Sequence, residues 1–358
     1  MRAAVCHEFG RPLAIEELDL KPPDAGEVNL RVAACGVCHS DVSFIDGAWD
    51  VALPAVFGHE VAGVVVAVGD GVDSVAAGDR ALVTLVRTCG RCFFCLRGEP
   101  TQCEGRFAID EAGALRSGDV TIKQGLHVAG FAECVTVDAS QVVKLPDGVP
   151  LDVVCLVSCA VATGFGAVRN TARVTAGASV VVIGVGGVGL NVVQAAAIVR
   201  ADPLIAIDTL DSRLGAATRR GARHAINGRQ TGVEETVRRL TGGHGADFVF
   251  IAAGSAAAAQ QAMRLVRRGG TVVMVGMPPT GQAVPIDPGD MADRALHLLG
   301  SKLGSIQPQV DLPDIVDLYR RGSLLLDDLV TGRFPLEEIN HAIALTRKGA
   351  GLRNVIVP

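Results

Sequence analysis

A glycine-rich turn between an apolar strand and a helix constrains the fold of this chain most strongly. Val180–Ile183 is a continuous apolar run, Gly184–Gly189 follows it with the pattern G-x-G-G-x-G, and a helical stretch runs from 188 to 199. Glycines permit a tight turn and let the backbone amides of a helix N-terminus approach a pyrophosphate. The pattern alone is weak, but the preceding strand and the following helix supply the context of a dinucleotide-binding unit.

Further apolar runs alternate with helical stretches downstream of this turn. They are Leu204–Ile207, Phe248–Ile251 and Thr271–Val275. Strands that are buried on both faces and alternate with helices are typical of βαβ units in a parallel sheet. The sequence therefore predicts an α/β fold with a doubly wound Rossmann domain over residues 161–302.

An acidic residue ends the second strand of this predicted domain. Asp208 lies nineteen residues after Gly189. A carboxylate at this place accepts hydrogen bonds from the adenine ribose hydroxyls and repels a 2′-phosphate, so NAD is favoured over NADP. Arg213 can soften that rejection, which leaves NADP as the alternative.

The N-terminal part of the chain has a different texture. Short alternating apolar runs such as Val28–Val32 and Val61–Val68 are broken by glycine, proline and aspartate, which is typical of a mostly antiparallel β domain. After residue 303, two helical segments, Leu312–Arg321 and Leu336–Lys348, precede a final strand at Asn354–Val357. A chain of 358 residues is expected to form two domains.

Four of the ten cysteines, Cys89, Cys92, Cys95 and Cys103, lie within fifteen positions. They are too close for independent disulfide loops, and no signal-peptide core precedes them, so we predict metal ligation in a reducing cytoplasm. Four thiolates on a short polar lobe suit a closed tetrahedral zinc site. An iron–sulfur cluster is the rival, but the fourth cysteine is too distant and no proline follows it.

Charge and hydropathy exclude two classes of partner. The net charge is −5 with acidic and basic residues interspersed, so no basic stripe attracts nucleic acid or an anionic membrane. The stretch Ala178–Val199 is uncharged, but its glycines fit a strand, a turn and a helix better than a membrane span.

A second metal site is suggested by three separated residues. Cys38 lies in the segment Gly36–Asp41, His59 follows twenty-one residues later, and Cys159 comes much later. Two cysteines and one histidine give the three protein ligands of a catalytic zinc with an open fourth position. Each fragment alone is weak, because a lone histidine is commonly a satisfied core residue and a lone cysteine a small buried hydrophobe.

These pieces together resemble the zinc-dependent alcohol dehydrogenases of the medium-chain dehydrogenase/reductase superfamily. The segments Gly36–Asp41 and Gly58–Gly63, the four-cysteine lobe, Cys159 with Thr163–Gly164 and the glycine turn stand in the family's order over nearly the whole chain. The resemblance implies a GroES-like, β-rich catalytic domain at 1–160, to which 303–358 return, beside the Rossmann domain. The active site is expected between the two domains.

By this resemblance, Cys38, His59 and Cys159 bind the catalytic zinc, and hydride passes between an alcohol and NAD. Zinc lowers the pKa of a bound hydroxyl, in agreement with this chemistry. Asp41 is expected to orient His59 through its other ring nitrogen. Glu60 is expected to exchange as a transient ligand, with an ordinary buried ion-paired carboxylate as the alternative.

The proton relay departs from the family's pattern. Ser40 has the family's role of taking the proton from the alcohol, but Ser43 stands where the best-known members carry a relay histidine. A serine cannot act as a terminal base near pH 7. The relay would then end on water, on the ribose, or on another residue such as His39.

The resemblance also assigns the cofactor contacts, although core packing explains several of them equally well. The expected residues are His39 and Arg353 at the pyrophosphate, Thr163, Val188 and Val275 at the nicotinamide, and Gly184, Gly186, Gly187, Gly189, Asp208 and Arg213 at the glycine turn and the ribose.

The substrate pocket is expected to contain Ser40, Trp49, Leu85 and Met277, and its apolar walls favour a bulky primary, aromatic or allylic alcohol. Polyol, amino-alcohol and glutathione-adduct oxidation are alternatives. So are a nucleotide-binding relative without turnover and a zinc-free reductase, although the latter class lacks these cysteines. The segment Phe107–Gly130 resembles the longer insert of dimeric members, which favours a homodimer built through edge strands of the Rossmann sheets over a tetramer.

Overall fold

The computed structural model describes residues 1–358, which separate into two compact units. One unit, here called the β-rich unit, contains Met1–Ala160 and Gln307–Pro358. The other, the parallel-sheet unit, contains Val161–Ile306.

The β-rich unit contains two sheets with mostly antiparallel pairing. The first has the order β2 (Ala14–Glu17), β1 (Arg2–Cys6), β5 (Ala55–Val56), β9 (Val120–Gln124), β8 (Leu115–Ser117) and β3 (Asp19–Leu20). The second has the order β11 (Val142–Lys144), β7 (Arg80–Val83), β6 (Glu60–Val68), β4 (Glu27–Val37), β19 (Arg353–Ile356) and β18 (Val330–Phe334), and β10 (Cys134–Asp138) pairs with β4.

Short helices connect these strands, and two longer ones come from the C-terminal segment. They are α1 (His39–Ile45), α2 (Phe93–Leu96), α3 (Ala108–Ala112), α4 (Leu151–Val154), α11 (Pro308–Arg320) and α12 (Ile339–Arg347). Single 3₁₀ turns occupy Pro100–Gln102, Gly125–His127, Ala139–Gln141, Cys155–Ser158, Asp327–Leu329 and Leu336–Glu338.

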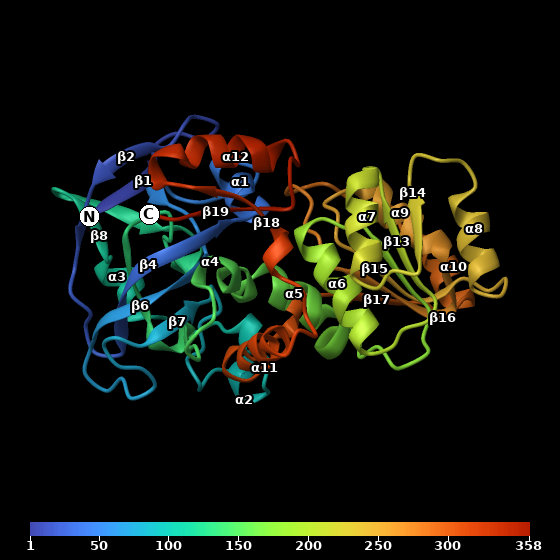
Figure 1. Ribbon diagram of the computed structural model, residues 1–358, viewed down its shortest axis with the longest axis horizontal. Helices are drawn as coiled ribbons and strands as arrows, with labels where there is room; N and C mark the ends of the chain where they lie inside the picture. The colour runs from blue at the N-terminus through green and yellow to red at the C-terminus, as the bar shows by residue number, and fades with distance from the viewer. The chain divides into compact units, whose positions relative to one another are not determined.

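The core of the β-rich unit joins the two ends of the chain. Fully buried Phe57, Phe131 and Leu30 share one apolar cluster with Ala342 and with Ile356 near the C-terminus. In Figure 1 the red C-terminal strand β19 lies beside the blue strand β4, and the register pairs Ile356 with Cys35. The C-terminal segment therefore adds strands β19 and β18 to the sheet that contains β4.

The parallel-sheet unit contains one sheet of six parallel strands. Its order is β14 (His224–Asn227), β13 (Leu204–Asp208), β12 (Val180–Ile183), β15 (Ala246–Ile251), β16 (Val266–Met274) and β17 (His297–Gly300). The helices are α5 (Ala160–Gly166), α6 (Gly187–Ile198), α7 (Asp211–Arg219), α8 (Val233–Leu240), α9 (Ala256–Leu265) and α10 (Pro288–Asp293), with a π-helical turn at Ala167–Thr171 and a 3₁₀ turn at Leu303–Ser305.

The chain order of this sheet is 3-2-1-4-5-6, that of a doubly wound dinucleotide-binding fold. All four residues of β12 are buried, because helices cover both faces of a parallel sheet. Alternate residues such as Val181, Ile205 and Val249 pack against α8 and α9. The α/β fold class predicted from the sequence is confirmed.

Some predicted elements differ in their limits. The helix predicted to begin at Leu312 begins at Pro308, since proline fits the first turn of a helix, where its missing N–H costs no hydrogen bond. The segment Leu336–Lys348 is a 3₁₀ turn followed by α12. Residues 107–130 contain α3, β8 and β9, and these strands belong to the first sheet.

No single helix is both long and apolar enough to cross a membrane. One bent pair, Leu151–Ser158 with Ala160–Thr171, meets the length and composition requirement, and nothing beyond length and composition marks it.

Candidate active site and metal centres

The first candidate metal centre is a buried cluster in the β-rich unit. Cys38, His59, Glu60 and Cys159 place their ligand atoms within 4.8 Å of one another, and all four residues are buried. Sheet register accounts for the first three, because antiparallel β4 and β6 pair Gly36 with Glu60. Cys38 and His59 therefore lie at the same end of the sheet, where β4 ends and β6 begins.

The start of helix α1 fixes the direction of Cys38. Cys38 is the N-cap residue with extended backbone angles, φ −99° and ψ 154°. Its N–H donates to Oδ2 of Asp41, the third residue of the helix, at 3.0 Å. This is the backbone half of a capping interaction, so a local helix signal also places the first cysteine.

The same Asp41 holds the imidazole of His59. Nδ1 of His59 lies 2.9 Å from Oδ1 of Asp41, which also accepts the N–H of Gly58 at 3.0 Å. The Asp41 and His59 side chains are fully buried. A carboxylate beside Nδ1 keeps the proton on that nitrogen, so the lone pair of Nε2 is available to a metal ion. Nε2 lies 3.3 Å from Sγ of Cys159.

The two thiols of this cluster are hydrogen-bonded to each other, and this contact shifts their pKa values in opposite directions. A hydrogen bond from Cys159 lowers the pKa of Cys38 well below its usual value against the effect of burial, and His59 and Arg353 act in the same direction. The same hydrogen bond, together with burial, raises the pKa of Cys159. A cation would stabilise both thiolates, so the donor set fits a zinc ion.

Glu60 forms a buried ion pair with Arg353. Nη2 of Arg353 donates to Oε1 of Glu60, which also accepts the N–H of Ala160 at 3.1 Å. Burial raises the pKa of Glu60 to about 7, although Arg353 opposes the shift. Oε2 of Glu60 is buried without a hydrogen-bond partner. An unpartnered buried carboxylate oxygen among thiol and imidazole donors is a second observation that fits a cation.

These contacts bear on two sequence-based assignments. Glu60 is ion-paired, which was the alternative given for this residue. Its Oε2 has no hydrogen-bond partner, so the predicted role as a transient metal ligand stays a prediction. Arg353, assigned to the cofactor pyrophosphate, is 5% exposed and lies against Glu60.

The second candidate metal centre is the four-cysteine lobe. Ligand atoms of Cys89, Cys92, Cys95 and Cys103 lie within 4.8 Å of one another. Backbone N–H groups of Cys89 and Cys95 donate to sulfur atoms of Cys103 and Cys92, each at 3.4 Å. Amides of Cys95 and Glu104 lower the pKa of Cys92 to about 6. Four convergent soft donors on a lobe with one short helix fit a closed zinc site.

The glycine turn in the parallel-sheet unit connects β12 to α6. Gly184 has a φ of +84°, a conformation in which side-chain-bearing residues are strained. A Cβ at Gly189 would lie 1.9 Å from the carbonyl oxygen of Gly184, so only glycine fits there. These two residues bring the start of α6 against the end of the strand, the geometry by which a helix N-terminus receives a phosphate.

Asp208 lies beside this turn at the carboxyl end of β13. Its Oδ2 accepts the N–H of Val185 at 2.8 Å, and its Oδ1 accepts the N–H of Leu210 at 3.0 Å. Nη1 of Arg213 lies 3.9 Å from Oδ2. The carboxylate is therefore held against the turn by backbone amides, and each oxygen keeps a lone pair for a further donor.

The other predicted residues occupy different surroundings. Oγ of Ser40 lies 3.7 Å from Sγ of Cys38, whereas His39 is exposed at the start of α1 and Ser43 is half-buried one turn later. Leu85 is half-buried against the core. In the parallel-sheet unit Thr163 and Val275 are buried, Val188 is half-buried and Met277 is 66% exposed.

Trp49 packs against an aromatic pair, Phe44 and Phe57, to which the sequence-based prediction gave no role. The ring of Phe44 contacts the ring of Trp49 edge-on, with 5.2 Å between the ring centroids, and stacks on the ring of Phe57 with 5.9 Å between the centroids. Phe44 follows Ser43, and Phe57 precedes His59 by two residues. Their closeness in sequence to the predicted ligands was the available signal, but aromatic residues at such positions are commonly core residues.

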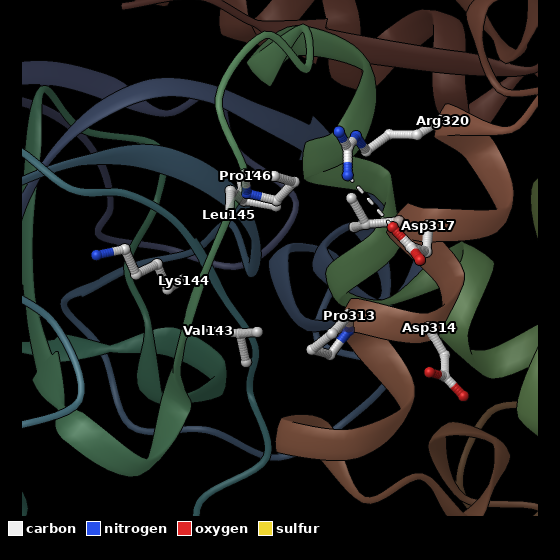
Figure 2. A pocket seen from close by; sticks show the side chains of 9 residues that line it. Val143, Lys144, Leu145, Pro146, Pro313, Asp314, Asp317 and Arg320 are labelled. Atoms are coloured by element: carbon white, nitrogen blue, oxygen red, sulfur yellow. Dashed lines mark hydrogen bonds and ion pairs between the residues drawn. The ribbon is translucent and has the colours of Figure 1, made fainter.

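A separate cavity of about 210 Å³ lies between β11 and α11 (Figure 2). Its lining includes Leu145, Pro146 and Pro313, with Arg320 3.3 Å from Asp317 at its rim. None of the predicted site residues lines it, and it is smaller than most ligand pockets. The chemistry of the chain therefore points to the two cysteine-containing clusters and the glycine turn.

The chain matches two protein-family models. Residues 24–147 match the family model of the alcohol dehydrogenase GroES-like domain, and residues 187–321 match that of zinc-binding dehydrogenases. The chain is 35% identical to an NDMA-dependent alcohol dehydrogenase of Amycolatopsis methanolica, over 99% of this chain and 98% of that one.

Two further proteins are similar over nearly their full lengths. An S-(hydroxymethyl)glutathione dehydrogenase of Synechocystis is 36% identical, over 99% of both chains. The crystal structure of a benzyl alcohol dehydrogenase from Acinetobacter calcoaceticus is similar with a TM-score of 0.93 and 31% identity, over 99% of this chain and 98% of that one.

Proposed function

Because the chain belongs to the zinc-dependent alcohol dehydrogenase family of the medium-chain dehydrogenase/reductase superfamily, we propose that its substrate is a bulky primary alcohol, aromatic or allylic, or the matching aldehyde or ketone. The predicted family and reaction class, hydride transfer between an alcohol and a nicotinamide cofactor, are confirmed. Zinc and NAD are the cofactors of this enzyme.

The convergence of Cys38, His59 and Cys159 carries the proposal for the catalytic site. These three residues would hold the catalytic zinc, and Cys89, Cys92, Cys95 and Cys103 the structural one. A zinc ion held at the first cluster would act as a Lewis acid and stabilise negative charge on the substrate oxygen. The proposed division of labour assigns residues 1–160 and 303–358 to catalysis and 161–302 to the cofactor.

The protein's own residues then orient and move protons. Asp41 holds the Nδ1 proton of His59, so that Nε2 faces the thiol ligands. Oγ of Ser40, at the edge of the cluster, accepts the hydroxyl proton of the substrate. The hydroxyl of Ser43 does not titrate near neutral pH, so the proton would have to leave through water, the ribose of the cofactor or His39.

Asp208 supports NAD over NADP. Backbone amides hold its carboxylate beside the glycine turn, where it would accept hydrogen bonds from the ribose hydroxyls and repel a 2′-phosphate. The proposed cofactor contacts otherwise follow the sequence-based assignment. Arg353 would have to leave Glu60 to reach a pyrophosphate.

The residues of the β-rich unit that are proposed to line the pocket include apolar side chains. The edge-to-face pair Trp49–Phe44 and half-buried Leu85 provide surfaces for a planar ring. The similarity to a benzyl alcohol dehydrogenase supports an aromatic substrate, and that to an S-(hydroxymethyl)glutathione dehydrogenase makes a glutathione adduct the alternative. Polyols are disfavoured because apolar walls leave hydroxyl groups unpaired.

A rate panel tests the substrate. NADH formation is measured with benzyl, allyl, short aliphatic and polyol substrates and with S-hydroxymethylglutathione, each with NAD and NADP. We expect the highest kcat/KM for benzyl or allyl alcohol with NAD. A clear preference for sorbitol-like substrates would overturn the apolar pocket. Two bound zinc ions without NADH formation from any alcohol would indicate a nucleotide-binding protein without turnover.

We also propose a homodimer in the cytoplasm. Strand β17 has a neighbour on one side only, and an open strand edge can pair with a second copy. Sedimentation equilibrium is expected to give twice the mass of the chain, and a tetramer or a monomer would contradict the proposal.

The four clustered cysteines, none in a disulfide, support a reducing compartment.

A further inference from the structure

Cys159 lies at a break between two helical segments. The 3₁₀ turn Cys155–Ser158 ends directly before it, and α5 begins directly after it at Ala160. Its own backbone angles, φ −141° and ψ −75°, are far from those of a helix. A regular ladder of helical hydrogen bonds therefore does not by itself fix the direction of this thiol.

Two side chains hold the peptide groups on either side of Cys159. Oγ1 of Thr84 donates to the carbonyl oxygen of Ser158 at 3.1 Å, and Oε1 of Glu60 accepts the N–H of Ala160 at 3.1 Å. Thr84, Ser158 and Glu60 are each fully buried. In such buried surroundings water does not compete for these side chain–backbone hydrogen bonds. The two contacts therefore fix the orientation of Cys159 from both sides.

Thr84 is itself held in place. Its N–H donates to the carbonyl oxygen of Gln141 at 3.0 Å, and Nε2 of Gln141 donates back to the carbonyl oxygen of Thr84 at 2.8 Å. Gln141 is also fully buried. The hydroxyl of Thr84 is thus presented from the end of β7 by a paired backbone rather than by a mobile loop.

We propose that Thr84 is a positioning residue for the metal ligand Cys159, acting through the carbonyl group of Ser158. The inference rests on the proposed ligand set, because it concerns the affinity of that site for zinc. Groups that orient metal ligands from outside the coordination sphere typically change metal affinity by about 10–100-fold when they are removed. Thr84 is outside the cluster of ligand atoms and would exert its effect without touching the substrate.

The test compares Thr84→Val, which keeps the shape and removes the hydroxyl, with Thr84→Ser, which keeps the hydroxyl. Zinc retention by the folded protein is measured by competition with a chromophoric chelator. We expect Thr84→Val to weaken one of two zinc sites by about 10–100-fold and Thr84→Ser to stay near wild type. The other zinc, in the four-cysteine lobe, serves as an internal control and should be retained equally in all three proteins.

A second readout reports the ligand geometry directly. With cobalt in place of zinc, the visible absorption bands of the weakened site should shift in Thr84→Val and stay unchanged in Thr84→Ser. If Thr84→Val does not fold, Thr84→Ala removes the same hydroxyl with less steric demand and is expected to show the same loss.

Three outcomes overturn the inference. They are wild-type zinc affinity in folded Thr84→Val, equal losses in Thr84→Val and Thr84→Ser, and loss of both zinc ions together. The proposed ligand set fails separately, because in that case the wild-type protein itself holds zinc at the four-cysteine lobe alone.

Discussion

Asp41 and His59 form a fully buried pair, 2.9 Å from Oδ1 to Nδ1, although eighteen residues separate them in the sequence. The same carboxylate accepts the N–H groups of Cys38 and Gly58. One side chain thereby fixes the orientation of one ligand and the backbone of another. The arrangement of the ligand side chains in the cluster therefore depends on Asp41 as well as on the ligands themselves.

Replacing Asp41 by asparagine should weaken zinc binding at the catalytic cluster. The amide can no longer hold the Nδ1 proton as a carboxylate does, so we expect about 10–100-fold lower zinc affinity there and unchanged binding at the lobe. Chelator competition measures this. Asp46→Asn, in the exposed pair with Arg347 just after the same helix, is the matched control and should retain both zinc ions. Equal affinities in the two variants would contradict the assigned role.

Removal of one lobe cysteine should affect stability before chemistry. In Cys95→Ala we expect the zinc content to fall from two ions to one per chain and the unfolding temperature to fall with it, because metal binding contributes folding free energy. Cys134→Ala, outside both clusters, should keep two ions. Elemental analysis and thermal unfolding give the answer. Lost activity in a Cys95→Ala protein that stays folded with both ions would be inconsistent with a structural role.

Asp208→Asn should reduce the preference for NAD. The amide keeps one acceptor oxygen for the backbone of the glycine turn but loses the charge that binds ribose hydroxyls and repels a 2′-phosphate. We expect kcat/KM for NAD to fall by about 10-fold or more and that for NADP to fall less or rise. Asp211→Asn, which removes an exposed carboxylate bonded to Asn227, is the control. An unchanged NAD to NADP ratio would disprove the assignment.

Protonation of Asp247, which accepts hydrogen bonds from Ser179, should make the parallel-sheet unit less stable in acid. Burial opposes the ionised form, but hydrogen bonds from the Ser179 hydroxyl and amide and from Arg267 outweigh it and lower the pKa of Asp247. A lowered pKa stabilises the fold above the unfolded value of about 3.9, and this contribution is lost as pH falls through the folded value.

Asp247→Asn should therefore lower the free energy of unfolding by about 1–3 kcal/mol at pH 7 and at pH 5, with the difference shrinking below about pH 4. Urea unfolding at pH 7, 5 and 3.5 measures it. Asp293→Asn, in the exposed pair with Arg268, should change little at any of these pH values. A difference that grows toward acid pH would show that the sign is wrong.

Ser43→His should restore a titrating group to the proton path. Because a histidine titrates near pH 6.5, we expect kcat to rise several-fold at low pH and to change little at high pH. The pH profile of kcat is compared with that of Ser43→Asn, which is polar but does not titrate in this range. Identical profiles for the two variants would indicate that the proton leaves by another path.

Several features were determined by the sequence because their signals are local. The glycine turn stands between an apolar strand and a helix, and the four lobe cysteines lie within fifteen positions, so short-range spacing predicts a nucleotide turn and a metal lobe. Alternation of apolar runs with helices likewise predicted the parallel sheet, whose strand order then followed the doubly wound pattern.

Features that depend on long-range packing were decided by the tertiary structure alone. Pairing of β4 with β6 and the helical break at Cys159 bring together ligands that lie up to 121 positions apart, which no local pattern specifies. Arg353 lies against Glu60, and Thr84 contacts Ser158, because the C-terminal strand and β7 pack around the cluster. Sequence spacing specifies bonded neighbours, whereas burial and sheet register select the contacts of a side chain across the fold.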